Sequence, residues 1–199
     1  MNKAELRRIY SEKRQTLSAR DALTLSGQIA EKFFTNVDLS KTRSLATFIR
    51  ILKFNEIDTS TIYYKLWRDF PSVRTFAPRT NLATCEIENI SFDAGTELLE
   101  NEWSIREPAN GESVKATNLD LILVPLLCFD RLGYRVGYGK GFYDRFLSTC
   151  RADCVKIGLS YFPPDAAIDD IGEHDVKLDY CVTPECVFEF GTKKDAEER

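Results

Sequence analysis

Ten consecutive residues in the second half of the chain bring glycines, charged groups and aromatic rings together. The run from Arg135 to Asp144 reads Arg-Val-Gly-Tyr-Gly-Lys-Gly-Phe-Tyr-Asp. Its alternating glycines let backbone N–H groups approach an anion closely, and the helix expected after Gly141 would add the positive end of its dipole. Arg135 and Lys140 add formal charge at the same place. The run therefore predicts a phosphate-binding loop.

The glycine spacing alone also fits a tight hairpin or turn whose lysine and arginine face water. The run is not the G-x-G-x-x-G dinucleotide fingerprint, and it lacks the four-residue gap and the Lys-Ser/Thr pair of the P-loop. A buried strand is expected over residues 119–125, shortly before the run. The run itself is rich in charged and aromatic residues. This concentration favours phosphate binding over a plain turn.

The composition is that of a globular protein. The 199 residues are 43% apolar and 29% charged, which excludes disorder, collagen and coiled coil for the whole chain. No apolar run approaches the roughly 20 residues that cross a bilayer, and the charged start predicts no signal peptide. The net charge of −4 argues against a general nucleic-acid or membrane-surface binder. We expect a cytoplasmic monomer.

The cysteines offer little for metal binding. A zinc site built from Cys150, Cys154, Cys181 and Cys186 would need unusual gaps between its ligands. A chain of this length needs no disulfide framework. We expect free thiols, mostly buried, in a reducing cytoplasm.

Hydrophobic periodicity predicts the elements that position the glycine-rich run. Helical spacing covers the first 35 residues, with a break at 18–21, and returns over 58–70 and from 141 to about 150. Apolar runs predict buried strands over 44–49, 73–77, 119–125, 155–160 and 180–183, and an edge strand over 85–92. This alternation predicts an α/β fold: a single three-layer domain over residues 1–190, with a mainly parallel central sheet flanked by helices in a Rossmann-like layout. Residues 191–199 are expected to form a polar tail.

The glycine-rich run resembles the signature of the 5-formyltetrahydrofolate cyclo-ligase (methenyltetrahydrofolate synthetase) family. Further segments fit the family in order from about Lys3 to Thr183: Lys3-x-x-Leu6-Arg7 with Arg14 beyond it, Glu56-Ile-Asp-Thr59, Phe76-Ala-Pro-Arg79, Trp103-Ser-Ile-Arg-Glu-Pro108 and Glu173-His-Asp-Val-Lys-Leu-Asp179. Between Phe48 and Glu56 the chain is about two residues longer than the family pattern. The aliphatic residue in contact with the substrate is therefore Ile49 or Ile51.

The resemblance implies an enzyme that uses ATP and Mg²⁺ to cyclise 5-formyltetrahydrofolate to 5,10-methenyltetrahydrofolate, with release of ADP and phosphate. An amide oxygen is a poor leaving group, so the formyl oxygen would first take the γ-phosphoryl group. Phosphoryl transfer depends mainly on positioning and charge neutralisation. Folate and ATP would be its partners.

The resemblance also implies an ATP site made of Lys3, Arg7, Arg135, Val136, Gly137, Tyr138, Gly139, Lys140, Gly141, Phe142 and Tyr143. Without it, Lys3 and Arg7 would be read as a solvated helix face. Because Arg135 and Lys140 lie in a glycine-rich turn, we expect little of the core to depend on either residue.

The implied folate contacts are Ile49, Glu56, Trp103, Tyr138 and Phe142. A carboxylate can accept two N–H bonds from a pterin edge, which suits Glu56. Trp103 is equally compatible with core packing.

The implied Mg²⁺ ligands are Asp144 and Asp175, although Asp144 is equally compatible with a helix cap. Arg79 and Arg106 are candidates for binding the glutamate tail or a phosphate, and His174 is expected to be a structural neighbour.

Two other functions stay open at this point. A regulatory module would bind ATP without turning it over. A sugar-phosphate isomerase would use a carboxylate base and need no nucleotide.

Overall fold

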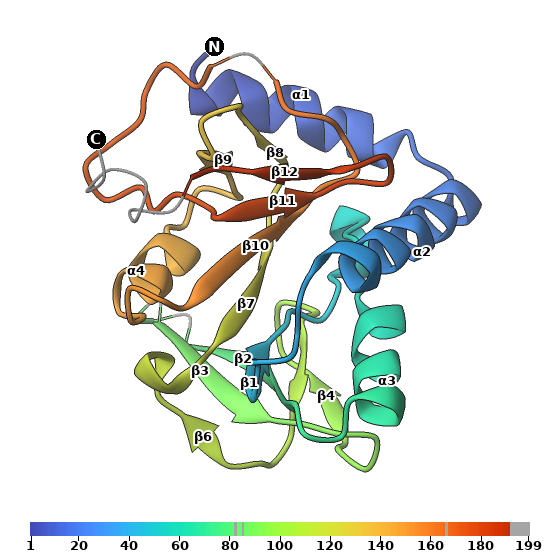
Figure 1. Ribbon diagram of the computed structural model, residues 1–199. Helices are drawn as coiled ribbons and strands as arrows, with labels where there is room; N and C mark the ends of the chain where they lie inside the picture. Colours follow the sequence, from blue (N-terminus) through green and yellow to red (C-terminus); the bar gives the residue numbers. More distant parts are fainter. Residues whose placement is uncertain (82, 85, 166, 192–199) are drawn as a thin grey trace.

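One mixed sheet of eight strands runs through the computed structural model, which describes residues 1–81, 83–84, 86–165 and 167–191 (Figure 1). Its order is β12-β11-β10-β7-β1-β2-β3-β6. The five strands from β11 to β2 are parallel. β12 pairs antiparallel with β11, β3 pairs antiparallel with β2, and β6 pairs antiparallel with β3. The bounds are β1 Ser44–Ala46, β2 Arg74–Asn81, β3 Glu86–Ser91, β6 Ser113–Val114, β7 Leu121–Pro125, β10 Val155–Leu159, β11 Tyr180–Val182 and β12 Val187–Glu189. The predicted α/β domain with a mainly parallel sheet is confirmed.

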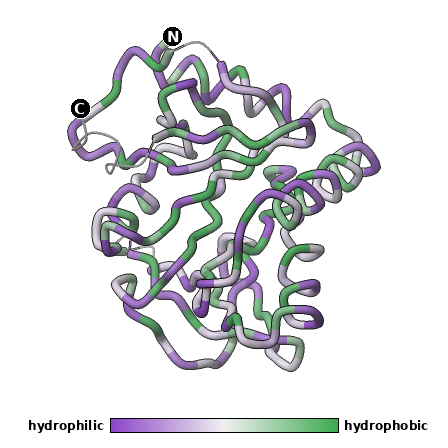
Figure 2. The backbone as a smooth tube through the Cα atoms, in the orientation of Figure 1, coloured by the Kyte–Doolittle hydropathy of each residue, from purple (hydrophilic) through white to green (hydrophobic). Residues whose placement is uncertain are grey.

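Helices cover both faces of this sheet, as Figure 1 shows. Their bounds are α1 Lys3–Gln15, α2 Ala19–Asn36, α3 Ser60–Asp69 and α4 Phe142–Ser148. Side chains alternate between the faces of a strand, so Leu121 and Leu123 of β7 pack with α2 and α3, whereas Ile122 and Val124 pack with α4. The central strands are accordingly hydrophobic along much of their length (Figure 2). The result is three layers.

The first two helices begin where polar side chains cap them. Asn2 Oδ1 accepts a hydrogen bond from the Glu5 N–H at 2.9 Å, and Glu5 Oε2 accepts one from the Asn2 N–H at 3.2 Å. Ser18 Oγ accepts the Asp21 N–H at 3.1 Å, which starts α2 at the predicted break. Within the described part of the chain, no helix is both long and apolar enough to span a membrane.

The structure corrects the prediction for the strand near residues 85–92. β3 is not an edge strand, because it pairs with β2 on one side and β6 on the other. Its expected first residue, Cys85, lies outside the described residues, as does most of the expected tail.

Several short elements were not predicted. They are β12, the hairpin of β4 (Leu98–Glu100) and β5 (Arg106–Pro108), the hairpin of β8 (Cys128–Phe129) and β9 (Arg135–Val136), and the 3₁₀ turns Leu52–Phe54 and Ala116–Asn118. Elements of two or three residues are too short to show a period.

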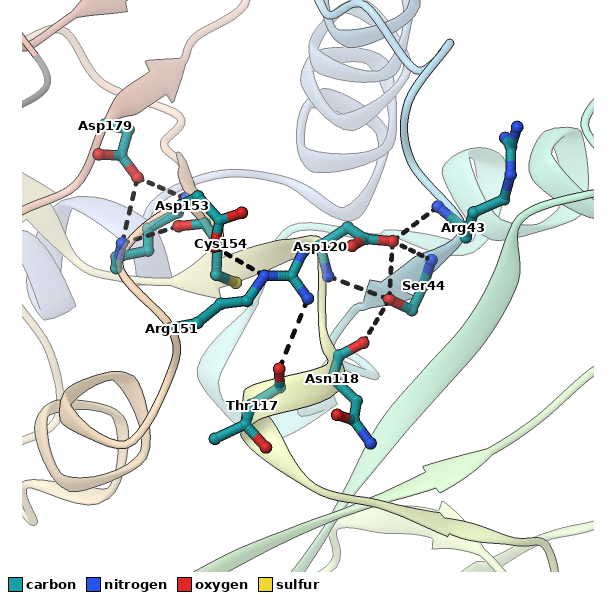
Figure 3. A network of polar contacts seen from close by, with 10 residues as sticks. Arg43, Ser44, Thr117, Asn118, Asp120, Arg151, Asp153, Cys154 and Asp179 are labelled. Carbon is teal, nitrogen blue, oxygen red and sulfur yellow. Dashed lines mark hydrogen bonds and ion pairs between the residues drawn. The ribbon is translucent and has the colours of Figure 1, made fainter. Parts of the chain in front are cut away.

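One carboxylate ties the amino ends of the parallel strands together (Figure 3). Asp120, directly before β7, accepts at Oδ2 from Arg43 N at 2.8 Å, Ser44 N at 2.9 Å and Ser44 Oγ at 2.9 Å. Arg151 donates to its other oxygen. Partial burial pushes the pKa of Asp120 upward, but Arg151, Arg43 and Ser44 outweigh it and lower the pKa below its usual value. We call Arg43, Ser44, Asp120 and Arg151 the amino-edge network.

Candidate active site at the carboxyl edge of the sheet

Helix α1 lies against the β8–β9 hairpin, beside the predicted phosphate loop. Leu6 and Tyr10 of α1 pack with Cys128 of β8 and Val136 of β9 in one apolar cluster. The hairpin follows the carboxyl end of β7, and the segment that carries Glu56 follows the carboxyl end of β1. Because these ends meet at one edge of a parallel sheet, the fold brings the two segments together.

The backbone of the glycine-rich run requires two of its glycines, and one of them lies against α1. Gly139 and Gly141 have φ values of +90° and +70°. A Cβ at Gly139 would lie 3.0 Å from Arg7 Nε, and Arg7 Nε donates to the Gly137 carbonyl at 3.0 Å. Arg7 therefore contacts the glycine-rich run and is half-buried, so its alternative interpretation as part of a solvated helix face is wrong.

Arg135 lies deeper than the sequence predicted. Its side chain is only 5% exposed; it donates to Asp144 Oδ1 at 2.7 Å and to the Val176 carbonyl. Burial lowers the pKa of Arg135, and Asp144 opposes that change. The expectation that little of the core depends on Arg135 is wrong, because the residue lies in a buried strand and not in a turn.

Lys3 and Asp175 form an ion pair next to Arg135. Lys3 Nζ bonds Asp175 Oδ2, which also accepts the Gly172 N–H at 2.6 Å. Burial pushes the pKa of Asp175 upward, but Lys3 and the Gly172 N–H lower it below the usual value. The Val176 N–H lies 3.4 Å from Asp144 Oδ1, so the chain brings Asp175 and Asp144 to the same place.

The carboxylate oxygens of Asp144 and Asp175 are the kind of ligand that a magnesium ion takes. Mg²⁺ takes oxygen ligands and commonly uses one or two protein carboxylates together with substrate phosphates. In the described part of the chain, their contacts use one oxygen of each, Oδ1 of Asp144 and Oδ2 of Asp175, so the second oxygen of each is available. No group of three or more His, Cys, Asp or Glu side chains suited to hold a metal occurs among the described residues.

Glu56 is a buried carboxylate on the other side of the glycine-rich run. It is 5% exposed and accepts the Ile51 N–H at 2.8 Å. Burial raises its pKa; the Ile51 N–H, the Tyr138 hydroxyl and the charge of Arg14 oppose the rise. Tyr138 and Asp144 both come from the glycine-rich run, so this one run lies near Glu56 and also carries the Asp144 carboxylate.

Exposed aromatic side chains lie close to Glu56 along the chain or are joined to its loop. Phe54 stacks on Tyr138 with ring centroids 4.9 Å apart. Lys53 donates to the Trp103 carbonyl, and Trp103 is 42% exposed, so its alternative role in core packing is wrong. Ile49 is 6% exposed within an apolar cluster, whereas Ile51 is only partly buried.

The remaining predicted residues differ in their burial and contacts. Val136 is buried, Tyr143 packs on Phe146, and Lys140 and Phe142 lie at or near the surface. Arg79 donates to backbone carbonyls of residues 108 and 109. The side chain of His174 is 91% exposed beside Glu173.

Sequence reasoning gave Arg14 no role, yet it is buried in this site. It lies 11 residues after Lys3 and 7 after Arg7, a spacing that keeps all three on one helix face. That spacing is the signal that could have pointed to it.

The fold and the site define an α/β protein whose polar site lies at the carboxyl edge of a mainly parallel sheet, where such folds bind their ligands. The chain belongs to the 5-formyltetrahydrofolate cyclo-ligase family, whose model matches residues 1–184. This confirms the resemblance in the sequence and identifies the chain as an enzyme of the cyclo-ligase type.

Individual relatives match over most of their length. The 5-formyltetrahydrofolate cyclo-ligase of Mus musculus is 24% identical over 89% of this chain and 91% of its own, and that of Escherichia coli K12 is 26% identical over 90% and 98%. The NMR structure of Aquifex aeolicus 5,10-methenyltetrahydrofolate synthetase gives a TM-score of 0.76 at 27% identity, covering 96% of this chain and 93% of that one. A structure of the synthetase from Mycoplasma pneumoniae gives 0.73 at 25% identity, with 92% and 99% covered.

Proposed function

We propose that this protein converts 5-formyltetrahydrofolate and ATP to 5,10-methenyltetrahydrofolate, ADP and phosphate. The formyl oxygen attacks the γ-phosphorus, and ADP leaves. The neighbouring N10 then attacks the activated formyl carbon and gives up its proton, the carbon–oxygen bond breaks, and phosphate departs with the former formyl oxygen and takes up that proton. Ring closure is thereby coupled to the cleavage of ATP to ADP and phosphate.

The glycine-rich run and α1 would bind the triphosphate. Lys140 is exposed next to two glycines with positive φ, where its ammonium and nearby N–H groups can meet phosphate oxygens. Arg7 closes over the run from α1. Arg135 holds Asp144 from within and adds positive charge beneath the phosphates.

Mg²⁺ would be held by the free oxygens of Asp144 and Asp175. When bound, it neutralises charge that develops on the transferring phosphoryl group. Arg135 and Lys3 already fix both carboxylates, so they need not be ordered when ATP arrives. Asp144 lies in the first turn of α4, where Gly141 is the N-cap without a side-chain cap bond, and the described contacts of Asp144 Oδ1 are with Arg135 and the Val176 N–H.

The residues around Glu56 would bind the pterin. Its carboxylate accepts N–H bonds from the ring, while Tyr138, Phe142 and Trp103 supply flat walls. Between the two aliphatic candidates, we favour Ile51, because Ile49 is packed in the core and Ile51 is the residue whose N–H holds Glu56.

One observation supports this function most directly: the glycine-rich run bonds Arg7 of α1 through the Gly137 carbonyl, and its Tyr138 lies near enough to Glu56 for the two groups to shift each other's pKa. A phosphate site and a pterin site would therefore share one short segment, as a reaction between their two ligands requires.

The test is a coupled assay with Mg²⁺-ATP, in the presence and absence of 5-formyltetrahydrofolate. We expect an absorbing methenyl product to form in step with ADP, and little phosphate without folate. Phosphate release at the same rate without folate would contradict the proposal. ATP binding with no turnover would favour the regulatory module, and isomerisation of a sugar phosphate without nucleotide would favour the isomerase. The cytoplasmic location, the monomeric state and the domain boundary at residue 190 stay predictions.

A further inference from the structure

Arg14 is a charged side chain buried beneath the candidate active site. It is 2% exposed. Nη1 donates to the Tyr138 hydroxyl at 2.8 Å, and Nη2 donates to the Leu126 carbonyl. Its guanidinium also lies over the Tyr161 ring, 5.8 Å from the centroid. Burial of a charge is costly unless the charge is paired, so this placement needs a reason.

The contact with Tyr138 sets the direction of a hydrogen-bond chain. A tyrosine hydroxyl carries one hydrogen, and arginine can only donate. Because Arg14 donates to this oxygen, the Tyr138 hydrogen is free to point at Glu56, whose carboxylate lies close enough to add to burial in raising the pKa of Tyr138. The chain therefore runs from Arg14 through Tyr138 to the carboxylate.

The main chain of Arg14 is joined to the same loop. Asn55 Nδ2 donates to the Arg14 carbonyl at 2.9 Å and to the Leu17 carbonyl at 3.1 Å. Asn55 directly precedes Glu56 and has a φ of 48°, so these two bonds hold a conformation that is unfavourable for a residue with a side chain. The end of α1 thus fixes the Glu56 loop from two sides.

We propose that Arg14 is a positioning residue that directs the Tyr138 hydroxyl toward Glu56 and thereby keeps Glu56 ready to accept the N–H groups of the pterin ring. This inference rests on the proposed role of Glu56 as the pterin anchor. Arg14 touches neither reacting atom and acts through its two neighbours.

A pH dependence follows from the groups that face Glu56. They are Arg14 from α1, Tyr138 from the glycine-rich run, Tyr143 from α4, the Ile51 N–H from its own loop, and Tyr161, which donates to the Glu56 carbonyl at 3.1 Å. Burial raises the pKa of Glu56, and Arg14 counters it. Without Arg14 the pKa rises further, so the acidic limb of the folate kcat/KM profile moves to higher pH.

The experiment compares the full-length parent with Arg14→Met, Arg14→Lys and Tyr138→Phe, with Arg8→Met as the matched control. Arg8 is on the same helix, but its side chain is 67% exposed and pairs with Glu12. For Arg14→Met we expect a loss of about 10–100-fold in folate kcat/KM at neutral pH, which recovers as the pH rises, and an ATP KM within about twofold. Arg14→Lys keeps the charge and should recover part of the shift. An acidic limb that stays in place, or an equal loss at every pH, would overturn the proposal.

A second measurement does not depend on activity or on the most severe variant. Carbon-13 NMR of the glutamate carboxyls gives the Glu56 titration directly, with its signal assigned by its loss in Glu56→Gln. We expect a higher Glu56 pKa in Arg14→Lys and in Tyr138→Phe, whereas an unchanged value in both would overturn the proposal. If the parent shows no folate-coupled ADP formation, the proposed function fails, but this titration still reports whether Arg14 acts on Glu56.

Discussion

The pKa values of the key carboxylates at the two edges of the central sheet are shifted in opposite directions. At the amino edge, Asp120 accepts bonds from Arg43 and Ser44 at the start of β1 and from the Arg151 side chain, and its pKa falls below the usual value. At the carboxyl edge, Glu56 is more deeply buried, has fewer donors, and its pKa is raised because the donors do not offset the burial. One edge uses an acid to join strands. The other holds an acid in an unfavourable state, as a binding site does before its ligand arrives.

The backbone shows the same difference. The carboxyl edge contains Gly139 and Gly141 with positive φ, and Arg7 lies directly over Gly139. The amino-edge network uses ordinary backbone N–H groups at the start of β1. Sequence changes at the two edges should therefore separate catalysis from stability.

The largest effect is expected for Lys140→Ala. Lys140 is exposed, so its loss should leave the free energy of unfolding within about 0.5 kcal/mol of the parent. A lost contact to a transferring phosphoryl group costs about 10²–10³ in kcat, by analogy with a lost oxyanion donor. The matched control is Arg131→Ala, an exposed charge in the β8–β9 turn. Near-normal kcat in folded Lys140→Ala would show that this lysine only faces water.

Glu56→Gln should lower folate binding while it stabilises the fold. Loss of a charged acceptor costs about 1.5–3 kcal/mol in folate kcat/KM, which is about 10–150-fold. The folded pKa of Glu56 is raised, so ionisation costs the parent stability as the pH rises above the unfolded value of about 4.3. The Tm advantage of Glu56→Gln should therefore grow from pH 4 to pH 7. A lower Tm at neutral pH would contradict the comparison.

Asp120→Asn should lower the stability of the fold while it leaves catalysis nearly unchanged. We expect a loss of about 1–3 kcal/mol in the free energy of unfolding at neutral pH, with kcat within about twofold of the parent. The folded pKa of Asp120 is lowered, so its contribution is present above the unfolded value of about 3.9 and is lost as the pH falls through the folded value. Urea denaturation at several pH values measures the difference, which should vanish in acid. A large loss of kcat with unchanged stability would contradict it.

The smallest and most specific effect concerns the metal. Asp144→Asn and Asp175→Asn should each raise the Mg²⁺ concentration for half-maximal rate by several-fold, and the double variant should show a non-additive loss, because both act on one ion. Asp144 also pairs with Arg135. A Mg²⁺ titration of Asp144→Asn that overlays the parent curve would therefore limit Asp144 to that ion pair.

Local sequence predicted the elements with strong apolar patterns. The strand at Leu121–Pro125 and the helix break at Ser18 appear where the pattern placed them. The antiparallel strand at Val187–Glu189 and the position of β3 inside the sheet were not predictable, since short strands carry no clear period and pairing is set by distant partners.

The candidate site divides in the same way. The composition of the run from Arg135 to Asp144 pointed to an anion site, but only the family resemblance linked it to Lys3 and Asp175. The burial of Arg135 depends on the Val176 carbonyl, which the fold supplies from a distant segment. The link from Arg14 to Glu56 likewise needs tertiary contacts that local patterns do not contain.

The most direct test of the central claim follows one oxygen atom. 5-Formyltetrahydrofolate labelled with ¹⁸O in the formyl group is converted by the parent enzyme with Mg²⁺-ATP in unlabelled water, and the released phosphate is analysed by mass spectrometry. If the carboxyl edge transfers the γ-phosphoryl group to the formyl oxygen, each phosphate carries one ¹⁸O, in step with ADP and the methenyl product. Phosphate without the label would contradict the account, because ATP would then be hydrolysed by water.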